Sequence, residues 1–176
     1  QDTRNALILD PVFDDGDPEL RTRKMASLQS ALKRAIQAQF DLEESELAAE
    51  PLPRRQDRRR ILLYEASEGG AGVLQRLLSE PEAIQRVAKT ALELLHYNPE
   101  TGADLRFGPS SEEECEAACY DCLMTYSNQM DHALLDRTTI RDYLRELAAG
   151  TLGPVQGPTE PEKHWGGLYE QCDSKL

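Results

Sequence analysis

Three cysteines lie close together in the stretch CEAACYDC, and their spacing could bind a metal ion. Cys115, Cys119 and Cys122 stand at positions i, i+4 and i+7, which on an α-helix share one face within about 60° of arc. Side chains four residues apart on a helix are roughly parallel and poorly placed for a disulfide. Burial of the thiols as small apolar residues is the plainer alternative. Three thiolates and one imidazole would complete a tetrahedral structural zinc site, so we predict Zn²⁺.

Several residues could supply the fourth ligand. We predict His132, which lies ten residues after Cys122 in a polar segment suited to fold back over the cysteines. Asp131 beside it could orient the imidazole. The alternatives are Cys172, Asn128 as a weak oxygen donor, and water. His96 and His164 lack such neighbours, and the sequence assigns them no role.

An iron–sulfur cluster or a pair of disulfides would fit the cysteines less well. The spacing C-x3-C-x2-C resembles the iron–sulfur motif of radical SAM enzymes, which lies on an early loop of a large barrel. Here it follows two-thirds of the chain, and Tyr120 lies one place too early. A mature secreted protein with two disulfides is disfavoured by the parallel thiols.

Composition limits the classes of function. The 176 residues carry a formal net charge of −12 and are 39% hydrophobic, which is typical of one globular unit. No apolar run approaches the roughly 20 residues that span a bilayer, so we expect no membrane contact. The acidic balance argues against a surface that binds nucleic acid throughout. One run of arginines interrupts the acidic sequence. We expect a solvated loop there, with a local phosphate or protein contact as the alternative. Its arginines are Arg54, Arg55, Arg58, Arg59 and Arg60.

The first half of the chain predicts strands around one helix. Residues 5–12 read NALILDPV, a short apolar run typical of a buried strand. Leu28, Leu32, Ile36 and Phe40 then repeat every four residues, which predicts a helix. Prolines make residues 47–53 an edge strand, and residues 59–67 form the clearest strand of the chain.

The second half predicts helices. Residues 68–79 pass from glycines into a helical pattern, and Ser79 with Glu82 has the spacing of a capping box before the next helix. Ser111 with Glu114 repeats that spacing before the cysteines. A last helix ends at Gly150, where a left-handed cap is expected. The fold class is therefore α+β: mainly helical, with a small sheet of two or three strands and a zinc-binding helical subdomain.

With these residues assembled, the chain resembles the MrfA-like zinc-binding domain, found in large superfamily 2 helicase-like proteins and in DISARM phage defence. Three features match in order: a strand ending in YEASEGGAG (64–72), the cysteine cluster, and LLDR (134–137). The likeness covers about residues 1–150. Four-cysteine members carry a further cysteine where this chain has Asn128, so the resemblance does not provide the fourth ligand.

The resemblance implies an accessory domain of a cytoplasmic, ATP-driven DNA helicase or translocase, in DNA repair or phage defence. Its partners would be the helicase core domains, of the same or another chain, and DNA. It also implies that residues 151–176 are a linker and the start of a further module. Accordingly, we expect a piece of a longer polypeptide, since the chain begins at Gln1.

No nucleotide site is visible, and we expect no enzymatic activity from this chain. EGGAG lacks the Lys-Ser/Thr ending of a phosphate-binding loop. We expect Gly69, Gly70 and Gly72 to form a strand-to-helix turn, with a DNA or partner contact as the alternative. The alternative function is a metal-dependent nuclease or hydrolase, with Glu65, Glu68 and His132 as candidate catalytic groups.

Overall fold

The protein, seen in a computed structural model, is described at residues 4–13, 16–66, 70–108, 113–151 and 153. Its sheet has three antiparallel strands in the order β1-β3-β2. These are β1 (Ala6–Leu9), β2 (Leu47–Arg54) and β3 (Asp57–Glu65). The predicted clearest strand is central, and the proline-containing β2 lies at an edge, as predicted. The arginine run forms the end of the β2–β3 hairpin.

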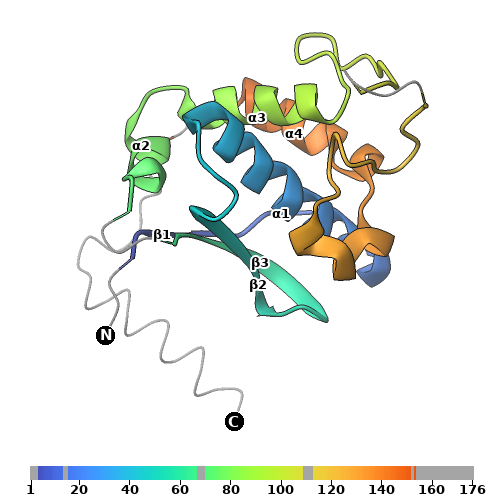
Figure 1. The fold of residues 1–176 in the computed structure, drawn as a ribbon. Helices are drawn as coiled ribbons and strands as arrows, with labels where there is room; N and C mark the ends of the chain where they lie inside the picture. Colours follow the sequence, from blue (N-terminus) through green and yellow to red (C-terminus); the bar gives the residue numbers. More distant parts are fainter. Residues whose placement is uncertain (1–3, 14–15, 67–69, 109–112, 152, 154–176) are drawn as a thin grey trace.

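The long helix α1 (Pro18–Phe40) covers one face of this sheet (Figure 1). Asp17 caps its first turn by accepting a hydrogen bond from the N–H of Glu19 at 2.9 Å. The predicted stripe at a spacing of four is buried: Leu28, Leu32 and Ile36 are at most 5% exposed. It packs against the inward residues of β3, so the core lies between helix and sheet.

The remaining helices are α2 (Val73–Ser79), α3 (Ala83–Leu94), α4 (Arg141–Ala149) and two short 3-10 helices, η1 (Tyr126–Leu134) and η2 (Arg137–Thr139). They lie around α1, with α3 and α4 on its far side from the sheet (Figure 1). The α+β class is thereby confirmed. In the described part of the chain no helix combines the length and apolarity that crossing a membrane needs.

Two predicted helix ends differ from the structure. Glu82 precedes α3 with φ 62° and its side chain makes no capping bond, so the expected box with Ser79 is absent. Gly150 has φ −72° and continues as extended backbone rather than as a left-handed cap.

The glycine turn, which contains Gly70 and Gly72, contacts the buried side chain of Glu65. Its carboxylate accepts hydrogen bonds from the N–H groups of Gly72 at 3.0 Å and Leu74 at 2.8 Å, at the start of α2. Gly70 has φ +53°, and a Cβ there would lie 1.7 Å from Oε2 of Glu65. The turn therefore needs glycine both for its backbone conformation and for this close approach.

We predict that Glu65→Gln destabilises the protein in a pH-dependent way. Burial alone raises the pKa of Glu65, but the hydrogen bonds from Leu74, Asn5 and Gly72 outweigh it and lower the pKa. The stabilisation is thus present above the unfolded-state pKa and lost as the pH falls through the folded-state pKa. The free energy of unfolding of the variant should be lower than that of the wild type by about 1–3 kcal/mol at neutral pH.

Urea denaturation at neutral and acidic pH measures this effect. The difference in free energy of unfolding between wild type and Glu65→Gln should shrink in acid. Glu50→Gln, at an exposed position on β2, should change the free energy of unfolding little at either pH. A difference that stays constant with pH would contradict the argument.

Candidate metal centre

Four potential ligand atoms from two separate segments converge at one point. The side chains of His96, Cys115, Cys119 and Cys122 place these atoms within 4.8 Å of one another. Nε2 of His96 lies 3.2 Å from Sγ of Cys119, and the Sγ atoms of Cys115 and Cys122 are 3.7 Å apart. In a tetrahedral zinc site the ligand atoms are separated by about 3.3–3.8 Å. The arrangement therefore fits one zinc-sized ion.

Burial keeps the groups of this cluster uncharged unless a cation joins them. His96, Cys115 and Cys122 are at most 5% exposed, and Cys119 is partly exposed. Burial raises the pKa of Cys115 and of Cys122 and lowers the pKa of His96. The imidazole is thus held in its neutral, ligating form, while the thiols would ionise only beside a strong positive charge. These three thiols with one neutral imidazole form a donor set that suits zinc.

His96 is positioned by the end of helix α3. Two residues beyond the helix, it adopts φ +63°, and its N–H donates to the carbonyl of Glu93. The chain then turns back through an antiparallel bridge between Tyr97 and Asp104. After this turn the N–H of Cys115 donates to the carbonyl of Arg106 at 2.8 Å, which brings the cysteine segment alongside His96.

The cysteine segment is not the helix that its spacing predicts. The described residues from 113 to 125 form bends and turns, and Ser111 of the expected capping box lies outside them. A helix rises about 1.5 Å per residue, so it would separate Cys115 from Cys122 by about 10 Å along its axis. A single ion needs these sulfurs much closer. A tight turn brings them together instead, in which the N–H of Cys119 points at Sγ of Cys122 at 3.1 Å.

Two arginines hold the backbone carbonyls of this irregular segment. Arg34 of α1 donates to the carbonyls of Tyr120, Cys122 and Met124. Arg137 donates to the carbonyls of Cys115 and Leu95 and forms a two-pronged pair with Asp104, at 2.9 and 3.0 Å. Because irregular backbone leaves carbonyls without helical partners, these guanidinium groups replace the hydrogen bonds that a helix would provide.

Arg137 is the last residue of the LLDR stretch. It is 2% exposed and lies over the ring of Tyr97 at 4.8 Å from the centroid. Through Leu95 and Cys115 it joins the histidine segment to the cysteine segment. It thus positions both halves of the cluster without contributing a ligand. The sequence offered no direct signal for this role, nor for that of Arg34.

The predicted fourth ligand, His132, is directed elsewhere. Its Nε2 lies 3.0 Å from the carbonyl oxygen of Thr125 and 2.9 Å from Oδ1 of Asn128. Asn128 also accepts from the N–H of Thr125 and donates to the carbonyl of Leu123. Both His132 and the alternative ligand Asn128 are therefore engaged in hydrogen bonds at the start of η1. The structure thus places His96, rather than His132, beside the three cysteines, and the fourth metal ligand stays a prediction.

Of the other candidates, Asp131 does not orient an imidazole but pairs with Arg58 at 2.6 Å. Cys172 and His164 lie outside the described residues. His96 was missed because it is far from the cysteines along the chain. The only signal for it is that it directly follows the last apolar residues of a strong helical pattern.

The arginine run is not simply a solvated loop. Arg58 is 3% exposed and ties the hairpin to Asp131. Arg54, Arg59 and Arg60 are exposed, with Arg59 paired to Asp57 and Arg60 to Asp10. Arg55 is half-buried and lies 3.5 Å from Asp131. The predicted contact of this run with DNA or a partner stays a prediction.

Two carboxylates, Glu65 and Glu68, were the candidates for hydrolytic chemistry. Glu65 is occupied by the N–H groups of the glycine turn. Glu68 and Gly69 lie outside the described residues. A partner contact of Gly70 and Gly72 also stays a prediction.

Comparison with known proteins supports the resemblance. The family model described as MrfA Zn-binding domain matches residues 28–123, more than half of the chain. The matched range contains all four residues of the cluster and neither His132 nor Cys172. Neither a curated protein nor a solved structure matches the chain. On the strength of the family match, the chain belongs to the MrfA Zn-binding domain family.

Proposed function

We propose that this chain is a zinc-stapled accessory domain of a large, cytoplasmic, ATP-dependent DNA helicase-like protein, acting in DNA repair or phage defence. The observation that carries the proposal is the convergence of His96 with the three cysteines inside the range matched by the family. Membership of that family supports the link to a helicase-like protein. The domain itself would bind and position, rather than catalyse.

The four residues would hold zinc in a closed site. When bound, the ion would neutralise the thiolates and cross-link the histidine segment to the cysteine segment. Four protein ligands leave no open position for water or substrate, which is typical of structural zinc. Because the described residues in 95–108 and 113–125 contain little regular structure, the metal would replace a core that these turns cannot build.

The exposed arginines of the hairpin are the proposed contact with DNA. Arg54 and Arg59 project from the end of β2 and the start of β3, on a chain whose overall charge is strongly acidic. The ion pair of Arg59 with Asp57 is exposed, so it is weak enough for a phosphate to compete with it. Such contacts would position the parent protein on DNA without reading its sequence.

Metal analysis and DNA titration test the proposal together. Protein purified without added metal should contain about one equivalent of zinc, and Cys119→Ser/Cys122→Ser should contain none. Arg54→Glu/Arg59→Glu should weaken binding to duplex DNA and reduce its salt dependence, while zinc content stays unchanged. Full zinc occupancy in the cysteine variant would refute the site; duplex affinity unchanged by the arginine variant would refute the contact.

A further inference from the structure

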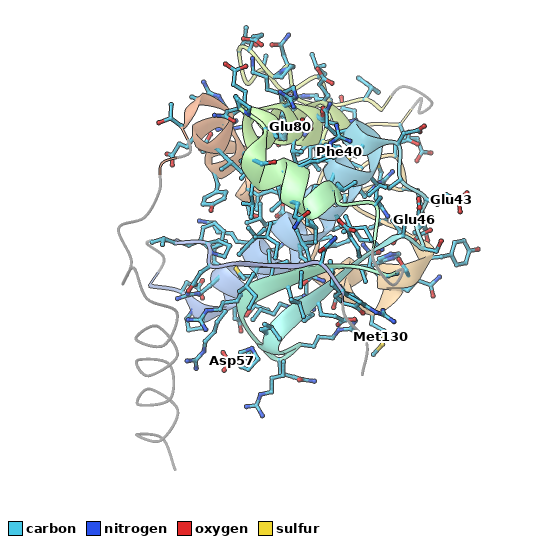
Figure 2. All side chains as sticks on the ribbon, turned by 90° about the vertical axis from the view of Figure 1, so that its left-hand side faces the viewer. Phe40, Glu43, Glu46, Asp57, Glu80 and Met130 are labelled. Atoms are coloured by element: carbon cyan, nitrogen blue, oxygen red, sulfur yellow. The ribbon has the colours of Figure 1, made fainter. Side chains whose placement is uncertain are left out.

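A polar cavity of about 440 Å³ lies between the first turn of α1 and the turn of the β2–β3 hairpin. Pro18, Arg21 and Thr22 line it from the helix, and residues 56–59 line it from the hairpin. Figure 2 shows Asp57 at the turn of this hairpin. The volume lies within the range of ligand-binding sites. We call this space the hairpin cavity.

Arg21 brings to the hairpin cavity a buried donor without an acceptor. Its Nε is buried and has no hydrogen-bond partner, and its guanidinium group forms no ion pair with a described residue. A buried polar group left unpaired costs free energy, so folded proteins rarely retain one without a ligand, an ion or a water that satisfies it. Arg23 also has a buried, unpaired Nε, but an ion pair with Asp136 at 3.0 Å holds its charge. The charge of Arg21 therefore remains available to a ligand.

Positive charge is in excess around the hairpin cavity. Arg59 donates to Asp57 at 2.9 Å in an exposed pair. Arg54 lies opposite Asp57 in the sheet and forms no ion pair with a described residue. The hydrogen bond from Arg59 lowers the pKa of Asp57, and the positive charges of Arg59, Arg54 and Arg21 lower it further. Three guanidinium groups thus act on one carboxylate, in a chain whose overall charge is −12.

The other charged groups beside the hairpin cavity are already occupied. Arg58 is buried and pairs with Asp131 at 2.6 Å. At the start of α1, Asp17 accepts from the N–H of Glu19, and these two residues are not among those that line the cavity. Pro18 has no N–H, so the start of the helix offers little to an anion. The attraction for an anion must come from the arginines.

We propose that the hairpin cavity binds a phosphate group, which accepts hydrogen bonds from Arg21 and Arg59 while Arg54 adds its charge at the rim. A guanidinium group presents its N–H donors in a planar fork that matches phosphate oxygens. A phosphate would also give Nε of Arg21 the acceptor that it lacks. The inference rests on the proposed function, which makes this group a backbone phosphate of duplex DNA. It extends the DNA contact from the hairpin to a residue of α1.

Thermal unfolding of the 176-residue chain in phosphate tests the cavity itself. Phosphate at about ten times its Kd should raise the Tm of the wild type by about 3–6 °C over chloride of equal ionic strength. Phosphate also stabilises proteins by exclusion from their surface, and that part should be equal in all variants. Arg21→Met should lose the site-specific shift. Arg145→Met, at an exposed arginine of α4 outside the cavity, should keep it.

Fluorescence anisotropy with a labelled DNA duplex identifies the source of the phosphate. Arg21→Met should weaken duplex binding about tenfold and reduce the salt slope by about one, as expected for one lost phosphate contact. Arg145→Met should keep the wild-type affinity and salt slope. In chloride, Arg21→Met should be at least as stable as the wild type, because it removes an unpaired buried donor.

Three outcomes would overturn the phosphate site. They are a phosphate shift that Arg21→Met retains, a lower Tm of Arg21→Met in chloride, and an Arg21-dependent shift that oligoglutamate produces but phosphate does not. The second would show that the fold already supplies a partner for Arg21, and the third would make the ligand an acidic peptide. An Arg21-dependent phosphate shift with unchanged duplex affinity would refute DNA as the source and assign the site to a free phosphate compound.

Zinc content and the duplex affinity of Arg54→Glu/Arg59→Glu are measured alongside. If the chain holds zinc and its duplex binding depends on the hairpin arginines but not on Arg21, the inference about the cavity alone is wrong. If zinc is absent, or duplex binding depends on none of the three arginines, the proposed function is wrong.

Discussion

Arg137→Met is expected to lower the free energy of unfolding by about 3 kcal/mol or more and to release the metal. The substitution preserves much of the side-chain volume but removes every hydrogen bond that this side chain makes. The carbonyls of Leu95 and Cys115 would remain buried without donors, and Asp104 would lose its two-pronged partner. Arg137→Lys should recover little of this loss, because an ammonium cannot reproduce the planar fork.

Chemical denaturation followed by circular dichroism, together with zinc analysis, measures this loss. Arg141→Met is the matched control: Arg141 lies near the same Tyr97 ring at 6.0 Å, but its partner Asp142 is exposed. Arg141→Met should lower the free energy of unfolding by at most about 1 kcal/mol. Normal stability and zinc content in Arg137→Met would show that the segments around the cluster are held by other contacts.

His96→Ala should lower zinc affinity by more than about a hundredfold, whereas His132→Ala should leave the metal in place. Loss of a residue that only orients a ligand already costs about 10–100-fold in metal sites, and loss of a direct ligand costs more. His132→Ala removes a hydrogen bond at the start of η1 and should cost about 1 kcal/mol of stability.

Competition with a chromophoric chelator measures both affinities. Removal of all residues after Gly150 should also leave the zinc affinity unchanged, since the four ligands precede that point. The reverse pattern, with His132 needed and His96 dispensable, would restore the ligand set expected from the sequence. Metal loss on truncation alone would assign the fourth position to Cys172.

Local pattern predicted the elements well where one face of an element is buried. The repeat from Leu28 to Ile36 identified α1 because a helix against a sheet must bury one stripe. The prolines of β2 placed it at an edge because they cannot donate to a neighbouring strand. In both cases the physical constraint acts within a few residues, so it can be recognised in the sequence alone.

The site was less predictable because it depends on contacts between distant segments. The same-face spacing of Cys115 and Cys122 singled out residues that lie together in the structure, but on a different backbone, since sharing a helix face does not bring two sulfurs to one point. His96 reaches them only through the turn between Tyr97 and Asp104. Similarly, the arginine run showed no sign that Arg58 would find Asp131, far along the chain.

The outer edge of β2 limits how this domain can associate with others. The N–H of Ala66 donates to the carbonyl of Glu46, and Leu47 lies opposite Glu65 in the sheet. The backbone N–H and C=O groups of alternate residues, starting at Leu47, therefore point away from β3. Along that edge Pro51 has no N–H, and the carbonyl of Ala49 already accepts from Gln29 at 3.1 Å. An incoming strand would therefore find little to pair with, which guards the sheet against edge-to-edge aggregation. A partner that covers this side would consequently have to recognise it through side chains rather than by extending the sheet.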